Sequence, residues 1–230
     1  MPNIRPLHTD NVVQTLDKLI QFSLYTFAVF SIFSISVTQI AFTIGTLAWL
    51  LKIHLTKSWK ETKWTQVGIA ILFFCLACLL AVITSVDIES SYTHLKKLLQ
   101  FAVFFWTINT VQDERQRNLL IKLLIIAGTV AALNGFFQVW ETAVTIDSRV
   151  RGTMSHFMTF AGVLMLVSLM ALSRFLFHKP KEYWLLGSIG FMCSCLLFTL
   201  TRQAWLGFFV GSVFLVSSGI KNTFCLFRSY

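Results

Sequence analysis

Residues 22–51, FSLYTFAVFSIFSISVTQIAFTIGTLAWLL, contain no charged side chain. An α-helix rises about 1.5 Å per residue, so this stretch would form a helix of about 45 Å, whereas the hydrocarbon core of a bilayer is about 30 Å thick. One strongly tilted helix or two short helices joined by a turn would fit this length. We favour two helices, with the turn near SISVTQ at residues 34–39.

Apolar runs of membrane-spanning length continue along the chain, and the links between them are short and polar. Hydrophobic residues make up 56% of the chain and charged residues 13%, which is too little charge to cover a water-soluble surface. We therefore predict an all-α, polytopic transmembrane bundle of about eight helices, formed as a single membrane region over residues 1–230. The further spans are expected at residues 66–86, 95–111, 119–140, 157–177, 183–201 and 204–220.

Basic residues gather in alternate links, as the positive-inside rule expects of cytoplasmic loops. The segment KIHLTKSWKETK at residues 52–63 has four lysines and one glutamate, and DERQR (113–117) and HKPKE (178–182) fall on the same side. This pattern accounts for the net charge of +9 without nucleic acid, which we exclude as a partner. On the outer side there remain Lys96, Lys97, Arg149, Arg151 and Arg202.

Three of these outer cations lie near predicted helix ends. Lys96 and Lys97 either extend to lipid headgroups and pair with outer acidic residues or contribute to a site, and both interpretations stay open. Arg202 interrupts LLFTLTRQAWLGFFVG (196–211), so it lies in a minimal turn between two spans. An unpaired charge at the bilayer edge costs free energy, which favours a functional role for Arg202.

Arg149 and Arg151 are separated by one residue. In an extended loop both guanidinium groups would face the same way, and their planar forks suit bidentate contact with phosphate oxygens. Together with Arg202 they predict a clamp for a pyrophosphate group at the outer membrane surface. His156, at the start of the next span, either donates a hydrogen bond to the same group or caps its helix and packs.

Two other features predict helix packing. Asn134 and Gln138 lie one helical turn apart and favour an interhelical hydrogen bond over an ion site. Gly207 and Gly211 form a G-x-x-x-G step, which is typical of close helix packing. Ion-coupled carriers place acidic residues or histidine deep within their helices, and the sequence shows none there, which argues against a transporter or channel subunit.

The segments RVRGTMSHFMTFAG (149–162) and TLTRQAWLG (199–207) resemble two patterns of the bacterial O-antigen ligase and O-antigen polymerase superfamily, which also includes protein O-oligosaccharyltransferases. The first pattern is arginine, glycine and threonine, then histidine-proline-asparagine, then an alanine in the following helix. It is matched by Arg151, Gly152, Thr153, His156 and Ala161, whereas Phe157 and Met158 replace the proline and asparagine. The second pattern is matched by Thr201, Arg202, Ala204, Trp205 and Leu206, and Gly207 extends it.

This resemblance implies a glycosyltransferase of lipopolysaccharide biosynthesis in the bacterial inner membrane, with its site facing the periplasm. It would transfer a glycan from an undecaprenyl-pyrophosphate carrier to an acceptor sugar on lipid A-core or a growing glycan, without a metal or cofactor. Arginines aimed at the leaving pyrophosphate would stabilise the charge that develops there.

In the family, the general base is thought to be a histidine in a large periplasmic loop, which we expect beyond Tyr230. The chain then corresponds to the N-terminal part of such a ligase, and we assign no catalytic residue within it. The alternatives are an O-antigen polymerase of the same superfamily, a membrane transporter subunit and an inactive truncated relic.

Overall fold

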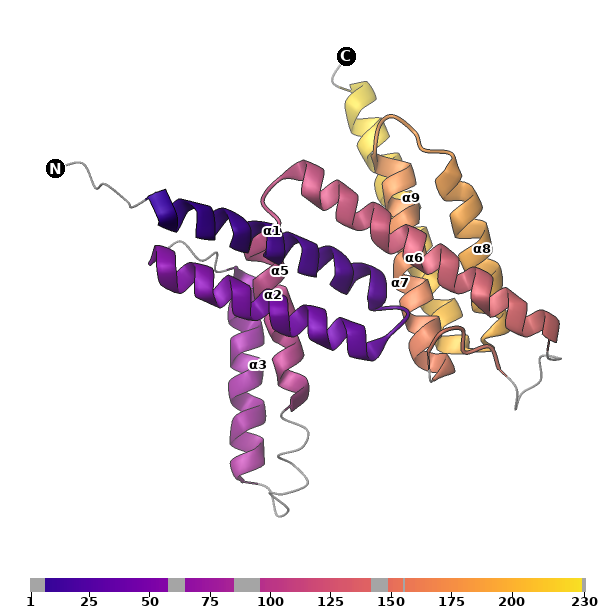
Figure 1. The fold of residues 1–230 in the computed structure, drawn as a ribbon. Coiled ribbons are helices and arrows are strands. Elements are labelled where there is room, and N and C mark those ends of the chain that lie inside the picture. Colours follow the sequence, from indigo (N-terminus) through magenta and orange to yellow (C-terminus); the bar gives the residue numbers. More distant parts are fainter. Residues whose placement is uncertain (1–6, 58–64, 85–95, 142–148, 155, 229–230) are drawn as a thin grey trace. The chain divides into compact units, whose positions relative to one another are not determined.

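The computed structural model describes residues 7–57, 65–84, 96–141, 149–154 and 156–228, and these residues are helical with no strand (Figure 1). The helices are α1 (Leu7–Phe30), α2 (Ile35–Thr56), α3 (Gln66–Ile83), the 3-10 helix η2 (Lys96–Phe101), α5 (Ala102–Thr110), α6 (Glu114–Glu141), α7 (Phe157–Phe177), α8 (Trp184–Phe198) and α9 (Arg202–Arg228). The chain forms two compact units. Unit 1 comprises Met1–Phe27 and Thr38–Arg117, and unit 2 comprises Ala28–Val37 and Asn118–Tyr230.

Among the described residues, four helices are long and apolar enough to cross a membrane: α2, α3, α6 and α7. Helix α8 is apolar but shorter. These helices confirm the all-helical fold and indicate a membrane protein, whereas a bundle of about eight spans and a single membrane region stay predictions.

The uncharged stretch forms two helices, as predicted, joined by a turn at residues 31–34. The backbone N–H groups of Phe33 and Ser34 donate to the carbonyl of Phe30 and end α1. The hydroxyl of Ser34 accepts from the N–H of Val37 at 3.4 Å and so caps the first turn of α2. The turn therefore lies at the start of the SISVTQ segment.

The prediction that these two helices are short is wrong, because α1 begins at Leu7 and α2 continues to Thr56. Leu16, Ile20 and Leu24 recur every fourth residue of α1 and are buried. This spacing places the three residues on one face of the helix, so the segment before residue 22 is an amphipathic helix. A search for uncharged runs of membrane-spanning length leaves this segment out because it contains charged residues.

Unit 1 packs around the indole of Trp106 in α5, which is fully buried. The ring of Phe27 lies 5.9 Å and that of Phe42 lies 6.2 Å from the Trp106 ring, both edge-on. Gly45 of α2 faces the same indole, and a Cβ atom at this position would collide with it. The absence of a side chain therefore lets α2 and α5 approach closely.

Unit 2 is built around α7, whose buried residues recur at intervals of three and four along one face. Helix α9 packs against it through glycines, each of which faces the α7 residue 42 positions earlier. The facing pairs are Gly207 with Met165, Gly211 with Leu169 and Gly219 with Phe177. The constant offset means that α7 and α9 run parallel, and it confirms close helix packing at the G-x-x-x-G step.

Candidate functional site

The helices of unit 2 bring distant parts of its sequence to the same end. Arg174 in the last turn of α7 hydrogen-bonds to Asn118 near the start of α6, so these two helices run antiparallel. The starts of α7 and α9 therefore lie at the opposite end of the unit, together with the end of α6 (Figure 1). We call this the arginine end, because the loop before α7 and the first residue of α9 carry Arg149, Arg151 and Arg202.

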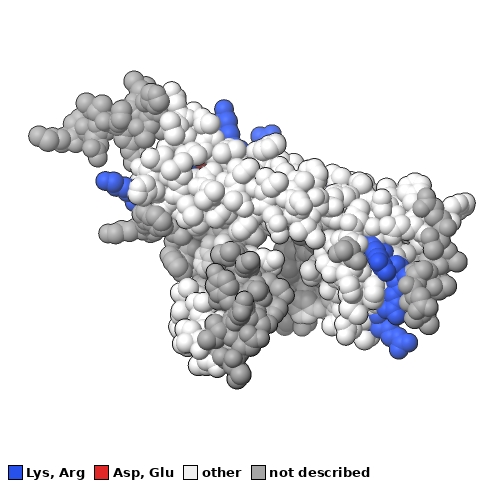
Figure 2. Space-filling view, turned by 60° about the horizontal axis from the view of Figure 1, so that its bottom comes forward, with Lys and Arg blue, Asp and Glu red and all other residues white. Residues whose placement is uncertain are grey.

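The arginine end presents exposed positive charge. Figure 2, in which the lower side of Figure 1 comes forward, shows Lys and Arg side chains gathered at the right of the view, where the arginine end lies. Arg151 and Arg202 are exposed and Arg149 is half-buried. Within the described residues, neither Arg151 nor Arg202 forms an ion pair. Their guanidinium groups are therefore available to an anionic ligand.

The loop that carries two of these arginines is held by Gln138 of α6. Its Oε1 accepts hydrogen bonds from the backbone N–H groups of Arg151 (3.3 Å) and Gly152 (3.0 Å), and its Nε2 donates to the carbonyl of Gly152 (2.6 Å). We predicted that Gln138 bonds to another helix, and this is wrong. The chain folds back over the end of α6 before α7 begins, so the partner is the loop backbone.

Gly152 is required at this point of the loop. Its φ is +59°, in the left-handed region that favours glycine, and the ring of Phe160 lies where a Cβ atom would be. The loop therefore follows the surface of α7 more closely than another residue type would allow.

The loop is anchored at two further residues. The hydroxyl of Thr153 donates to the carbonyl of Ile32, in the turn between α1 and α2, at 2.6 Å. Val150, between the two arginines, is buried with an exposed fraction of 3%. The burial of Val150 fixes the loop between the two arginines, whereas a shared face for Arg149 and Arg151 stays a prediction.

His156 caps α7 and packs against its first residue. Its Nδ1 accepts a hydrogen bond from the N–H of Met158 (3.3 Å), and its ring stacks on Phe157 with centroids 4.8 Å apart. The guanidinium carbon of Arg149 lies 4.7 Å from the centroid of the same Phe157 ring. Since Nδ1 is an acceptor, the neutral imidazole carries its proton on Nε2, which is the atom left to donate to a ligand.

Arg202 is the first residue of α9, directly after a tight turn. The carbonyl of Thr201 accepts from the N–H groups of Ala204 (3.0 Å) and Trp205 (3.3 Å), and the indole N–H of Trp205 donates to the carbonyl of Leu196 (3.0 Å). Residues of the second sequence pattern thus fix the α8–α9 turn. The positive end of the α9 dipole adds to the charge of Arg202 and favours an anion here.

The opposite end of unit 2 contains a compact ionic network. Glu182 accepts hydrogen bonds from Arg174 (3.1 Å) and Trp184 (3.2 Å) and forms an ion pair with Lys122 (2.9 Å). The hydrogen bond from Arg174 is the main cause that lowers the pKa of Glu182 to about 2. Here two cations share one acid, whereas Arg151 and Arg202 pair with no acid among the described residues.

Two predicted accessory residues belong to unit 1. Lys96 and Lys97 begin η2 in unit 1, and their side chains are outside the described part of the structure. Three acidic residues predicted on the outer side as partners for these lysines also lie outside the described residues: Asp87, Glu89 and Asp147. A contribution of the two lysines to the site therefore stays a prediction.

Fold and geometry together define a helical membrane protein with a cationic loop and turn at one end of a helical unit. No protein-family model, curated protein or solved structure matches the chain. Among the described residues, no group of three or more histidine, cysteine, aspartate or glutamate side chains is arranged to hold a metal ion.

Proposed function

We propose that this membrane protein binds the pyrophosphate of a lipid-linked glycan at the arginine end. It would take part in glycan transfer of the O-antigen ligase or O-antigen polymerase type. The observation that carries the proposal is that Arg149, Arg151 and Arg202 come from distant segments to one end of unit 2, where two of them are exposed and unpaired among the described residues. The donor would be an undecaprenyl-pyrophosphate glycan, and the acceptor a sugar of lipid A-core or of a growing glycan.

The chemistry of this transfer fits the cations. When the oxygen of an acceptor hydroxyl attacks the sugar carbon, a new carbon–oxygen bond forms and the hydroxyl proton passes to a base or to water. The bond between the sugar carbon and the phosphate oxygen breaks, and its electron pair stays on the pyrophosphate. Guanidinium groups that contact these oxygens stabilise the developing charge, and they do so most strongly where water is excluded. The arginines thus serve donor binding and leaving-group stabilisation, and no general base is assigned among the described residues.

The charge distribution of unit 2 supports an orientation. The end with the ionic network also carries Lys179 and Lys181, so the positive-inside rule favours the cytoplasm for that end. The arginine end would then face the periplasm of a bacterial inner membrane, where lipid-linked glycans are transferred.

The test is a binding measurement on the purified chain in lipid nanodiscs, with undecaprenyl pyrophosphate as the probe. A charge-assisted hydrogen bond contributes about 1.5–3 kcal/mol, so Arg202→Ala or Arg151→Ala should raise the Kd by about 10-fold to 100-fold. Arg202→Lys should recover only part of this loss, because an ammonium group cannot form the bidentate contact.

Arg115→Ala provides the matched control, since Arg115 is an exposed arginine of α6 that lies in unit 1. Undecaprenyl monophosphate, which lacks the second phosphate, should bind more weakly than the pyrophosphate. Equal affinity of the wild-type chain and the Arg151 and Arg202 variants would refute the proposed function.

A further inference from the structure

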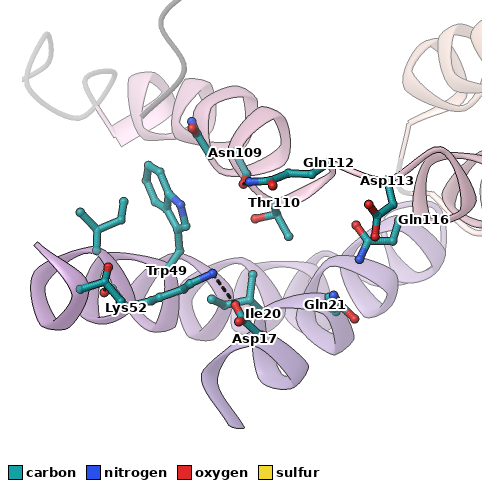
Figure 3. Close-up of a pocket in the computed structure, with 12 residues that line it drawn as sticks. Asp17, Ile20, Gln21, Trp49, Lys52, Asn109, Thr110, Gln112, Asp113 and Gln116 are labelled. Atoms are coloured by element: carbon teal, nitrogen blue, oxygen red, sulfur yellow. Dashed lines mark hydrogen bonds and ion pairs between the residues drawn. The ribbon is translucent and has the colours of Figure 1, made fainter. Parts of the chain in front are cut away.

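Unit 1 contains a polar cavity that is separate from the arginine end. It has a volume of about 330 Å³ and lies between α1, α2 and the segment that runs from the end of α5 to the start of α6 (Figure 3). Small-molecule sites in proteins begin at about 300 Å³, so this volume suits a compact ligand and is small for a nucleotide or an oligomer. All of the residues that line it belong to unit 1.

The charges in the cavity disfavour an anion. Lys52 Nζ lies 2.6 Å from Asp17 Oδ1, so these two groups largely neutralise each other. Asp113 adds a second carboxylate, which forms no ion pair with any described residue. A phosphate or carboxylate ligand would face more negative than positive charge.

Several lining side chains have unused hydrogen-bonding capacity. Within the described residues, the side chains of Gln21, Gln116, Asp113 and Trp49 form no hydrogen bond. The two amides supply donors and acceptors, the carboxylate only acceptors and the indole only a donor. A ligand that satisfies all four must carry both donors and acceptors, as hydroxyl groups do.

Trp49 also supplies a flat apolar surface. Figure 3 shows its side chain extending from α2 toward Asn109, between the two groups of helices that border the cavity. The face of an indole carries partial negative charge and attracts polarised C–H groups. A molecule with a C–H face and hydroxyl groups at its edge would use both the ring and the amides.

We propose that this cavity binds a neutral polyhydroxylated molecule about the size of one sugar ring. A quaternary ammonium ion could stack on Trp49 and pair with Asp113, but its ammonium group has neither an N–H donor nor an acceptor for the amides of Gln21 and Gln116. The cavity lies in unit 1 and the arginine end in unit 2, so the proposal does not rest on pyrophosphate binding or glycan transfer.

Saturation-transfer NMR on the full chain in nanodiscs tests the assignment, with glucose, choline and inorganic phosphate as separate probes. We expect saturation of the glucose signals by the wild-type chain, and about a fivefold weaker affinity in Gln21→Leu, which removes one neutral hydrogen-bonding group. Trp49→Leu should weaken glucose binding as well. Gln14→Leu is the matched control, because Gln14 is an exposed glutamine of α1 outside the cavity.

Each other outcome overturns the proposal. Binding of choline or phosphate without glucose would assign a different class of ligand. If no probe receives saturation from the protein, the cavity binds none of these ligands and contains only water. Glucose binding that is unchanged in both Gln21→Leu and Trp49→Leu would place the sugar elsewhere. If Trp49→Leu fails to fold, Gln21→Leu decides the question. The wild-type Gln21 side chain makes no hydrogen bond with the described residues, so its loss should not disturb the fold.

Discussion

Replacement of Gln138 by alanine should loosen the arginine loop without disturbing the helices. The amide of Gln138 makes three hydrogen bonds to the backbone of Arg151 and Gly152, at 3.3, 3.0 and 2.6 Å. Alanine is a good helix former, so α6 itself should persist. The loop would keep its anchor at Thr153 and the burial of Val150.

The expected size of the effect follows from these bonds. A neutral hydrogen bond contributes about 0.5–1.5 kcal/mol net, so three of them give about 2–4 kcal/mol as an upper range. A loss of about 2 kcal/mol would raise the population of the open loop about 30-fold. Pyrophosphate affinity should fall as well, to the extent that the closed loop is no longer the main state.

Hydrogen exchange measures this opening directly, because the amides of Arg151 and Gly152 are the two donors to Gln138 Oε1. Both amides should exchange about 30-fold faster in Gln138→Ala. Gln138→Glu keeps an acceptor for both amides but loses the donor to the Gly152 carbonyl, so its exchange should be intermediate.

The control is Asn134→Ala, one turn earlier on α6. Asn134 is exposed, and among the described residues its side chain makes one long hydrogen bond, which Gln138 donates at 3.5 Å. Unchanged exchange at Arg151 and Gly152 in Gln138→Ala, or an equal effect of Asn134→Ala, would refute the role of Gln138 as the anchor of the loop.

Three further changes have expected outcomes. Gly152→Ala should cost about 1–2 kcal/mol for the left-handed backbone, with an added clash against Phe160, and should lower the midpoint of thermal unfolding. Gly211→Val should loosen α9 from α7 and lower the free energy of unfolding in detergent by about 1–3 kcal/mol. A Cβ atom at this position would lie only 2.7 Å from the side chain of Leu169 in α7. The pKa of Glu182 is lowered by Arg174 from 4.5 to about 2, so the stability it contributes is complete above pH 4.5 and is lost as the pH falls toward 2. Glu182→Gln should flatten this part of the pH profile of the unfolding midpoint, and an unaltered profile would contradict it.

The sequence predicted the helices more completely than the contacts between them. Apolar runs located α3, α6 and α7 closely, because a membrane-spanning helix has a characteristic length and composition. The start of α1 was missed because residues 7–21 combine charged residues with a buried face, and a search for uncharged segments excludes them. An amphipathic period of 3.6 would have found this extension.

In the candidate site, too, the sequence indicated individual residues but not the contacts between them. An arginine in an apolar chain is conspicuous because its burial in a membrane is costly, so Arg149, Arg151 and Arg202 could be selected from the sequence. The sequence pointed to Gln138 only as a residue of helix packing. Its importance depends on where the loop backbone returns after α6, which is a tertiary property. The cavity in unit 1 was missed for a related reason, since its polar residues come from three separated segments.

The phenylalanine at the start of α7 has a structural role of its own. His156 is the N-cap of α7 and Phe157 is its first residue, the position where proline is favoured because its missing N–H is not needed. Phenylalanine keeps the helix start through the His156 cap and adds an aromatic face, on which the guanidinium of Arg149 lies at 4.7 Å. A cation–π contact of this kind contributes about 0.5–2 kcal/mol. Phe157 therefore holds Arg149 against the start of α7, while the cap from His156 keeps the helix start intact.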